Sequence, residues 1–449
     1  MPTATSTFSI TTLPFLYNTK RAAMRNFKIY CLILTIGCFL TLSGCPKKET
    51  GKKVINYWDS MPPTEPVGMA IRSLMKEFEE KNPSIKIKYQ YITWGELNTK
   101  LQASIVGGNP PDVVLLDRFV TGSYAFREAL TPLDSYIQKD GIKSKDFWPA
   151  CWNEVVYDGK VWAIPHHTDA RALYYRVDDF KEVGLDPDKP PKTWDELFEY
   201  AKKLTKRDEK GRILRIGFLP YYGNTWLYLW GWLNGGEFMI DNKPTVNDPK
   251  IVEALDWTIK FEDYYGGAGA IDVTVSGYGS KEMDPFIMGK LSMRIDGDWY
   301  ISVLEKFGPK VEYRIAPPPA PAGRKSLTWS GGFAYCIPKG AKNPEEAWQF
   351  IKFMVSKESQ LKCGKMSSRI PALIEVSKDP FYVTHPKYKV FIDLMKVSRY
   401  RPVSPIANII WDELDKATQY ARLKKKTPKQ ALDDANEKIK IELEKISQK

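Results

Sequence analysis

The sequence offers few side chains arranged for catalysis or metal binding. His166 and His167 stand next to each other, and the third histidine of the chain is His385. Adjacent residues on an extended segment point to opposite sides, and no third ligand follows nearby in the sequence, so we expect no metal site at this pair. The pair is instead interpreted as joint residues near a polar cleft.

Sequence motifs of the common enzyme classes are also missing. There is no G-x-S-x-G nucleophile elbow, no Walker A loop, no H-E-x-x-H zinc motif and no dinucleotide-binding glycine fingerprint. Glycoside hydrolysis by a pair of carboxylates is not excluded, because Asp and Glu are plentiful and a sequence does not show the distances between them. We therefore expect a protein that is not an enzyme and has no cofactor, with a glycoside hydrolase as the enzymatic alternative.

Aromatic side chains are frequent and suggest binding instead of catalysis. The chain has 14 Trp, 24 Tyr and 20 Phe. Many of them fall in loop-like or strand-end positions, where a flat ring more often forms a binding surface than part of a core. Use of tryptophan in a large core is the alternative explanation.

The formal net charge of +12 is not arranged as a nucleic-acid-binding surface. Residues 1–45 contribute four basic side chains and no acidic one. The last 29 residues carry nine Lys or Arg and five Asp or Glu along helical sequence, a pattern typical of a solvated helix face. Because no basic stripe with interleaved aromatic residues is present, we expect no nucleic acid partner.

The segment that starts at Met24 has the pattern of an export signal. Two basic residues precede the apolar run 29–42, which is too short for a comfortable membrane span. The Leu-Ser-Gly-Cys sequence that follows resembles a bacterial lipobox, which implies cleavage before Cys45 and a diacylglyceryl group on its sulfur. We expect synthesis to begin at Met24, residues 1–44 to be a signal peptide and residues 45–52 to be a polar, lipidated tether.

The remaining cysteines do not form a disulfide framework. Cys151, Cys336 and Cys363 are three in number and show no C-x-x-C or metal-binding spacing. We expect small buried side chains, and whether any two of them pair stays open.

Strand and helix patterns alternate through the rest of the chain. Strands predicted at 54–58, 85–92 and 112–116 are separated by helices whose apolar residues share one face. This β-α-β-α-β order predicts parallel strands, right-handed crossovers and a sheet covered on both faces. With 449 residues the chain exceeds what one core usually organises, so we expect an α/β fold with two lobes.

Helix-start signals recur in the second half of the chain. Thr193 and Glu196 have the spacing of a capping box, and other helices begin with proline at the first helical position. These signals predict helices near 194–205, 249–265, 344–355 and 428–446, separated by strands near 213–219, 291–295 and 333–337.

Two segments are expected to connect the lobes. Asp158 and Gly159 predict a type I′ turn, so residues 154–164 are interpreted as a β-hairpin. We expect this hairpin to stop at Pro165 and the polar residues 166–169 to form a joint before a strand at 172–176. A second crossing is expected at 327–332, after a rigid proline-rich loop.

Several segments together resemble the extracellular solute-binding proteins of ABC importers, in particular the carbohydrate-binding group that includes the maltose-binding proteins. Besides the lipobox, the matching segments are YDGKVWAIP at 157–165, LYYRVDDF at 173–180, PKTWDELFEYAKKLT at 191–205, MGKLSMRIDGDW at 288–299, WSGGFAYCIPKGAKNPEEAWQFIKFMVS at 329–356 and SRIP at 368–371. They follow the family order and span most of the chain after residue 53. The resemblance implies a two-lobe periplasmic-binding-protein fold with a hinge and an interlobe ligand cleft.

The resemblance also implies lobe boundaries and site residues. It assigns residues 53–165 and 332–367 to the first lobe, and residues 170–328 and 368–449 to the second. In such sheets ligands bind at the carboxyl ends of strands. The candidates near these ends are the polar residues Asp59, Asp117, Arg118 and Asp169 and the aromatic residues Trp58, Tyr222, Trp226, Trp299, Trp329 and Trp411.

Two of the aromatic candidates have specific expectations. Trp299 follows Asp296-Gly297-Asp298, a turn that we expect to end the preceding strand, so its ring should be presented from a loop edge. Trp411 is expected to begin a helix, and the segment before it resembles a family stretch that ends in a sugar-stacking tryptophan. A place in the core is the alternative for both rings.

These expectations lead to one functional hypothesis. The chain is expected to be a monomer, anchored by lipid to the bacterial cell membrane on its extracytoplasmic side, that captures a sugar or oligosaccharide and delivers it to ABC transporter permease subunits. Carboxylates suit sugar hydroxyls and flat rings suit the C–H faces of sugars. A peptide or polyamine receptor on the same fold is the nearest alternative, and surface pairing of Asp117 with Arg118 is the alternative to their role in binding.

Overall fold

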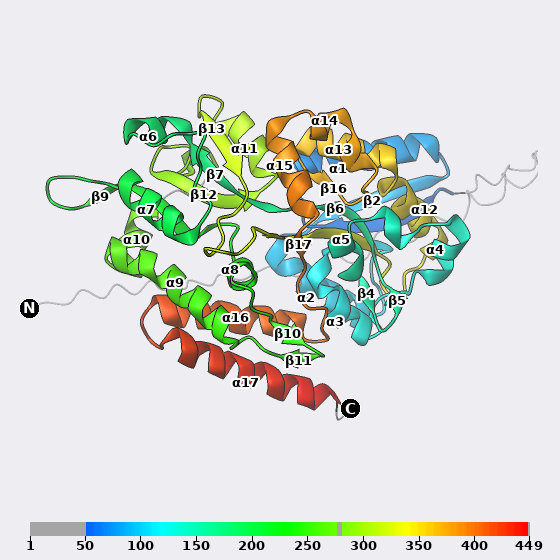
Figure 1. The fold of residues 1–449 in the computed structure, drawn as a ribbon. Helices are drawn as coiled ribbons and strands as arrows, with labels where there is room; N and C mark the ends of the chain where they lie inside the picture. Colours follow the sequence, from blue (N-terminus) through cyan, green and yellow to red (C-terminus); the bar gives the residue numbers. More distant parts are fainter. Residues whose placement is uncertain (1–50, 276–280, 448–449) are drawn as a thin grey trace, which may run out of the picture. The chain divides into compact units, whose positions relative to one another are not determined.

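The computed structural model describes residues 51–275 and 281–447, and in these ranges the chain folds around two separate β-sheets (Figure 1). Two hydrophobic cores form, and the core of the first sheet extends to Tyr174 and Tyr313 of the second sheet. Met24, the predicted signal peptide and Cys45 lie outside the described residues. No helix in the described ranges is both long and apolar enough to cross a membrane.

The first sheet contains six strands and includes the predicted parallel unit. β1 (Lys53–Asp59) pairs in parallel with both β2 (Ile85–Tyr91) and β3 (Val113–Asp117), as the β-α-β-α-β order predicted. The other three strands come from later parts of the chain, and β15 (Gly332–Cys336) pairs antiparallel with β3 and with β6 (Ile164–Thr168). In spatial order the strands are β16 (Ile370–Pro371), β6 (Ile164–Thr168), β15 (Gly332–Cys336), β3 (Val113–Asp117), β1 (Lys53–Asp59) and β2 (Ile85–Tyr91).

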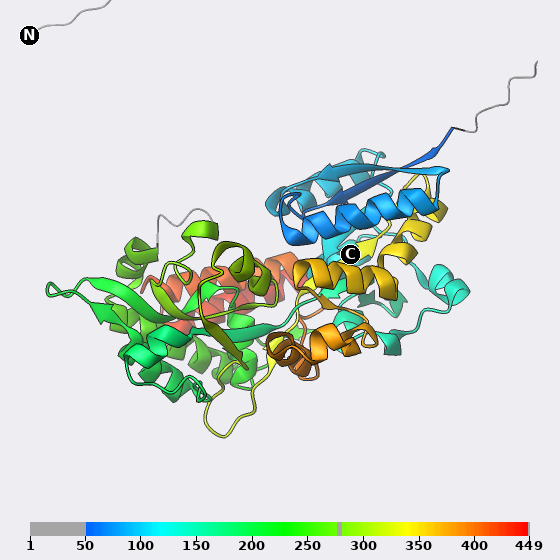
Figure 2. The same ribbon diagram turned by 90° about the horizontal axis from the view of Figure 1, so that it is seen from above.

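The second sheet contains five strands and lies in the part of the chain drawn mainly in green in Figure 2, away from the blue strands of the first sheet. Its centre is β12, which pairs antiparallel with β7 and in parallel with β9. In spatial order the strands are β13 (Tyr313–Ala316), β7 (Arg171–Arg176), β12 (Leu291–Gly297), β9 (Ile213–Gly223) and β8 (Lys206–Arg207). Short pairs are β4 (Val156–Tyr157) with β5 (Lys160–Val161), β10 (Met239–Ile240) with β11 (Lys243–Pro244), and β14 (Thr328–Trp329) with β17 (Ser398–Arg399).

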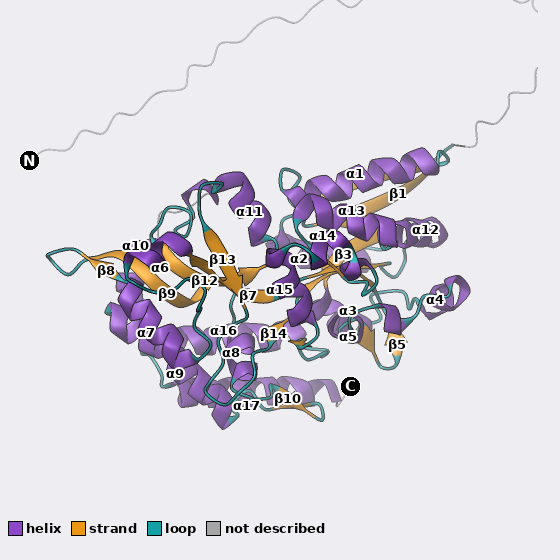
Figure 3. Ribbon diagram, turned by 45° about the horizontal axis from the view of Figure 1, so that its top comes forward, coloured by secondary structure: helices purple, strands orange, loops and turns teal. Residues whose placement is uncertain are grey.

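Helices cover both sheets, as Figure 3 shows in purple against the orange strands. In residues 51–204 they are α1 (Pro66–Lys81), α2 (Trp94–Val106), α3 (Thr121–Phe126), α4 (Asp134–Asp140), α5 (Pro149–Asn153), α6 (Val177–Glu182) and α7 (Trp194–Leu204). Later helices are α8 (Leu227–Leu233), α9 (Pro249–Tyr265), α10 (Ala268–Val275), α11 (Tyr300–Phe307), α12 (Pro344–Met354), α13 (Lys357–Ser367), α14 (Pro380–Val383), α15 (Pro386–Met395), α16 (Ala407–Arg422) and α17 (Pro428–Ser447). The predicted helix boundaries agree with α7, α9, α12 and α17 within one residue.

Local turn and cap signals are confirmed. Asp158 and Gly159 have φ angles of 49° and 69°, as a type I′ turn requires, and they connect β4 to β5. Thr193 and Glu196 form both hydrogen bonds of the capping box at the start of α7. The cysteines at 151, 336 and 363 are buried and free, as expected for small core side chains.

The prediction that the chain leaves its strand at Pro165 is wrong. Residues 164–168 form β6 inside the first sheet, so His166 and His167 are buried strand residues and no joint. The pairing of β15 with β6 is irregular between Phe333 and Ala334, next to Pro165, and this irregularity accommodates a residue without an N–H. Burial lowers the pKa of His166 to about 3, so its ring stays neutral.

The expected end of the strand before Trp299 is also wrong. β12 continues through Asp296 and Gly297, which pair with Ala172 and Arg171 of β7. A Cβ atom on Gly297 would lie 1.8 Å from the ring of Trp299, so only glycine allows this ring to fold back on the strand. The partner strand therefore overrides the turn preference of the sequence.

Two short links leave the first sheet. Asp169 and Ala170 join β6 to β7 of the second sheet, and Ser330 and Gly331 join β15 to β14, which pairs with β17 outside the second sheet. The strand at 370–371 pairs with β6 in the first sheet, although the resemblance assigned residues from 368 onward to the second lobe. The fold is thus a two-lobe α/β fold, and one of the two short links leads directly from the first sheet to the second.

Candidate functional site

Two arginines and two carboxylates form a buried network where the end of β3 meets the segment before α16. Glu154 accepts hydrogen bonds from Arg118 at 3.0 Å and from Arg401 at 2.9 Å, and Arg401 also donates to Asp117 at 2.8 Å. Burial lowers the pKa of Arg401, but the carboxylates of Asp117 and Glu154 outweigh burial and hold that pKa above its usual value. We call these four residues the Glu154 network.

The alternative that Asp117 and Arg118 pair with each other on the surface is wrong. Arg118 is 0% exposed, and its guanidinium also donates to the backbone oxygen of His167 at 3.1 Å and to Ser330 Oγ at 3.1 Å. A 3-10 turn follows β3 directly, with the side chain of Asp117 accepting a hydrogen bond from the backbone of Phe119. Arg118 therefore connects the first sheet to the second of the two short links.

Asp169 lies in the first link and binds three groups of the protein itself. Its carboxylate accepts a hydrogen bond from the backbone of Gly331 at 2.6 Å, pairs with Arg171 and lies 3.9 Å from Arg369. Burial raises the pKa of Asp169, but Arg171, Arg369 and Arg118 outweigh burial and hold that pKa below its usual value. We call Asp169, Arg171 and Arg369 the Asp169 network.

Trp299 borders the Asp169 network. Its half-buried ring lies 5.3 Å from the guanidinium of Arg171 and 4.6 Å from that of Arg369, distances typical of cation–π contacts. Trp329 lies on the other side of Arg171, at 3.9 Å, and is only 2% exposed. The first ring retains an accessible side, whereas the second belongs to the core.

We expect the stability of the protein to depend on pH through Asp298. This buried side chain accepts a hydrogen bond from the backbone of Ile370 at 3.2 Å. Burial raises the pKa of Asp298 to about 7, with Arg369 opposing the shift and Asp169 adding to it. In the unfolded chain an aspartate titrates near about 3.9, so the folded state holds a proton that the unfolded state releases, and the stability from this group falls as the pH rises from about 4 to about 7.

The variant Asp298→Asn removes this titration and keeps an acceptor for the Ile370 N–H. Its free energy of unfolding, measured in urea, should therefore improve relative to the wild type as the pH rises from about 5 to about 8. A difference between the two proteins that stays constant over this range would contradict the pKa of Asp298.

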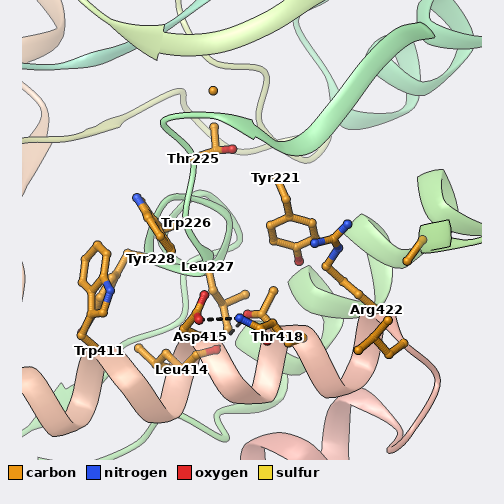
Figure 4. Close-up of a pocket in the computed structure, with 14 residues that line it drawn as sticks. Tyr221, Thr225, Trp226, Leu227, Tyr228, Trp411, Leu414, Asp415, Thr418 and Arg422 are labelled. Carbon is orange, nitrogen blue, oxygen red and sulfur yellow. Dashed lines mark hydrogen bonds between the residues drawn. The ribbon is translucent and has the colours of Figure 1, made fainter. Parts of the chain in front are cut away.

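A cavity of about 390 Å³ lies between α16 and the segment that joins β9 to α8 (Figure 4). At one end the rings of Trp226 and Trp411 meet with their centroids 4.5 Å apart, and Tyr228 lies 6.1 Å from Trp411. We call this cavity the aromatic pocket. It is lined by Tyr221, Gly223, Thr225, Trp226, Leu227, Tyr228, Ala268, Trp411, Leu414, Asp415, Thr418, Gln419, Arg422 and Leu423.

Trp411 links the aromatic pocket to the first sheet. Its helix begins at Ala407, one turn earlier than predicted, because residues 407–410 already have helical geometry. The ring is half-buried and packs 5.5 Å from Phe119, which follows β3, and 6.0 Å from Trp329. Arg401 of the Glu154 network lies 5.9 Å from the same ring. The pocket wall and the buried network therefore share this tryptophan.

The other predicted site residues are not brought into the aromatic pocket. Asp59 is buried and accepts hydrogen bonds from Tyr57 at 2.7 Å and from Tyr89 at 2.9 Å. Trp58 points to a separate depression on the face of β1 and β2, beside the loop that precedes β3. Tyr222 is half-buried, with the guanidinium of Arg294 5.1 Å from its ring.

Several pocket residues were missed by sequence reasoning. Tyr228, Asp415, Gln419 and Arg422 line the aromatic pocket, and only the first is aromatic. The three residues on α16 follow Trp411 at spacings of four, four and three, so the helical period would have placed them on its face. Nothing in the sequence distinguished that face from a solvated one.

Comparisons with known proteins agree on one family. A family model described as bacterial extracellular solute-binding protein matches residues 62–361. The solved structure of CpMnBP1 with mannotriose bound is 30% identical, with a TM-score of 0.80, and the match covers 86% of this chain and 100% of that chain. An ABC transporter solute-binding protein from Thermotoga lettingae bound with α-D-tagatose is 25% identical, with a TM-score of 0.76, over 87% of this chain and 99% of that chain. The maltotriose-binding protein of Pyrococcus abyssi is 24% identical over 377 residues, which cover 81% of this chain and 76% of that protein.

Proposed function

Because this chain belongs to the bacterial extracellular solute-binding protein family, we propose that it captures a sugar or short oligosaccharide in the aromatic pocket for import by an ABC transporter. The observation that carries this proposal is the pair formed by Trp226 and Trp411 at one end of a cavity whose other end is polar. Flat rings cover the C–H faces of a sugar, and polar side chains hold its hydroxyl groups.

The ligands named for similar proteins support a carbohydrate. Mannotriose, tagatose and maltotriose are named for the proteins compared above. Because the mannotriose-bound structure combines 30% identity with full coverage of its chain, mannobiose and mannotriose are the first ligands to test. A peptide or polyamine receptor on the same fold is the alternative within the family.

The predicted site residues divide into two groups under this proposal. Trp226 and Trp411 line the pocket, keep accessible ring surface and contact the ligand, whereas Trp299 keeps accessible ring surface beside the Asp169 network. The remaining candidates do not line the pocket. Asp59, Asp117, Arg118, Asp169 and Trp329 are buried or bonded within the protein, Tyr222 lies against Arg294, and Trp58 is half-buried beside a separate depression.

Lobe closure completes the proposed mechanism. The resemblance implies residues 53–165 and 332–367 for the first lobe and residues 170–328 and 368–449 for the second. Because β6 and β16 belong to the first sheet, residues 166–168 and 370–371 would also move with the first lobe, and the short links at 169–170 and 330–331 are the places where the backbone bends. Trp411 contacts Phe119 beyond β3, so closure would change the environment of the pocket wall.

A glycoside hydrolase is disfavoured, because catalysis needs two carboxylates beside the bond and Asp415 is the one carboxylate in the described pocket lining.

Thermal unfolding with a ligand panel tests this function. Mannobiose, mannotriose, maltotriose, spermidine and a peptide mixture would each be added to the purified protein. A glycan at a hundred times its Kd should stabilise the folded state by about 2.7 kcal/mol and be recovered intact. Cleavage of the glycan would refute the receptor, and stabilisation by spermidine or peptides alone would replace the sugar by the alternative ligand.

The membrane anchor and the monomeric state belong to the same proposal. A diacylglyceryl group on Cys45 supplies two acyl chains, which hold a protein on a membrane firmly, whereas one chain does so weakly. Metabolic labelling with a fatty acid should mark the wild type and leave Cys45→Ala unlabelled. Absence of label from the wild type would refute the anchor and leave the sugar receptor untouched.

A further inference from the structure

The wall that α16 gives to the aromatic pocket changes character along its length. Trp411 stands at one end, and Asp415, Gln419 and Arg422 follow on the same face. With a rise of 1.5 Å per residue, the wall from Trp411 to Arg422 extends over about 16 Å. A single pyranose ring is considerably shorter than this wall, so the wall can contact several linked sugar units.

Polar atoms at the far end of this wall are held in place and still available. Gln419 donates to one carboxylate oxygen of Asp415 at 2.7 Å, the contact dashed in Figure 4. Arg422 donates through Nε to Glu262 at 2.6 Å and lies 5.3 Å from the ring of Tyr221. Within the described ranges no hydrogen bond engages Oδ1 of Asp415 or Oε1 of Gln419. These two oxygens can therefore accept hydrogen bonds from hydroxyl groups.

The charges at this end favour a neutral ligand. The carboxylates of Asp415 and Glu262 face the single guanidinium of Arg422, so a sugar acid would meet more negative than positive charge. The side chain of Asp415 is half-buried, so it is partly shielded from water, and this burial raises its pKa. A neutral hydroxyl suits such a place better than a carboxylate.

We propose that Asp415 and Gln419 form a specificity-determining subsite for the hydroxyl groups of the sugar unit most distant from Trp226 and Trp411. The protein then binds linear neutral oligosaccharides more tightly than the corresponding monosaccharides. This inference rests on the proposed function, because the aromatic end must hold the first sugar unit. Arg422 supports the wall through its ion pair with Glu262.

Calorimetric titration with two sugar series tests the subsite. The probes are mannose, mannobiose and mannotriose, and glucose, maltose and maltotriose. In the wild type the affinity should rise along the series that binds. Asp415→Asn and Gln419→Ala should each weaken trisaccharide binding about tenfold or more, as loss of a hydrogen bond to a polar or charged partner does. The shortest sugar that binds should keep its affinity within about twofold.

A matched control comes from the same helix. Asp412 is an exposed carboxylate that does not line the pocket, so Asp412→Asn should leave the whole series unchanged. If only the trisaccharide binds the wild type, its affinity is compared between the two variants. The subsite then requires a weaker affinity in Asp415→Asn than in Asp412→Asn. Equal losses of affinity for short and long sugars in the Asp415→Asn and Gln419→Ala variants, or no loss, would refute the subsite and leave the proposed sugar receptor supported. Failure of both series to bind would overturn the sugar receptor itself. Unchanged thermal unfolding confirms that each variant is folded.

Discussion

Replacing Glu154 by alanine should lower the free energy of unfolding by about 3–5 kcal/mol, the usual cost of removing one partner from a buried ion pair. Glu154 is 1% exposed and accepts hydrogen bonds from both Arg118 and Arg401. The alanine variant leaves two buried guanidinium groups facing one carboxylate fewer. Urea denaturation at neutral pH measures the difference.

A surface pair provides the comparison for this variant. Glu128 pairs with Lys339 at 2.9 Å, and both side chains are mostly exposed. Solvent screens such a pair, so Glu128→Ala should leave the free energy of unfolding nearly unchanged. Glu154→Gln keeps the size and one acceptor oxygen, although its NH2 group faces one of the two guanidinium groups, so it should recover only part of the loss. An effect of Glu154→Ala as small as that of Glu128→Ala would mean that the buried network contributes little to stability.

The Glu154 network also fixes the pocket relative to the first sheet. Arg118 follows β3 directly, and Arg401 precedes α16, the helix that carries Trp411. The guanidinium of Arg401 lies 4.7 Å from the ring of Phe119 and 5.9 Å from that of Trp411. Loss of Glu154 should therefore weaken sugar binding through the position of α16, although Glu154 does not line the pocket.

Local features of the fold could be predicted because their causes lie within a few residues. The turn at Asp158-Gly159 depends on positive φ angles, and the start of α7 depends on the reciprocal bonds between Thr193 and Glu196. The parallel unit of β1, β2 and β3 follows from alternating strands and helices, since crossovers of that length force parallel pairing. The two-lobe arrangement was predicted from the segments that resemble the solute-binding protein family.

Features that depend on distant partners could not be predicted. Pro165 and Gly297 usually interrupt strands, yet β15 and β7 pair with the segments that contain them. Glu154 and Arg401 are 247 positions apart, and Arg118 and Ser330 are 212 apart, so no spacing in the sequence connects them. For the same reason Asp117 and Arg118 were not recognised as partners of the second half of the chain.

Replacing Trp411 by alanine should weaken binding of the identified sugar by about 2 kcal/mol or more, roughly a thirtyfold increase in Kd. The ring forms one side of the aromatic pocket and holds Trp226 at 4.5 Å between centroids. Its loss removes a stacking surface and frees the neighbouring ring. Trp411→Phe keeps a flat apolar ring and should restore much of the affinity. Titration calorimetry of both variants measures the change.

The same titration distinguishes the two places where a sugar could stack. Trp299 borders the Asp169 network, away from the lining of the aromatic pocket, and Trp94 is 54% exposed on α2. If the aromatic pocket is the main site, Trp411→Ala should cost more affinity than Trp299→Ala, and Trp94→Ala should have no effect. A large loss for Trp299→Ala with wild-type affinity for Trp411→Ala would move the site to the Asp169 network, where the half-buried ring of Trp299 lies beside the guanidinium groups of Arg171 and Arg369.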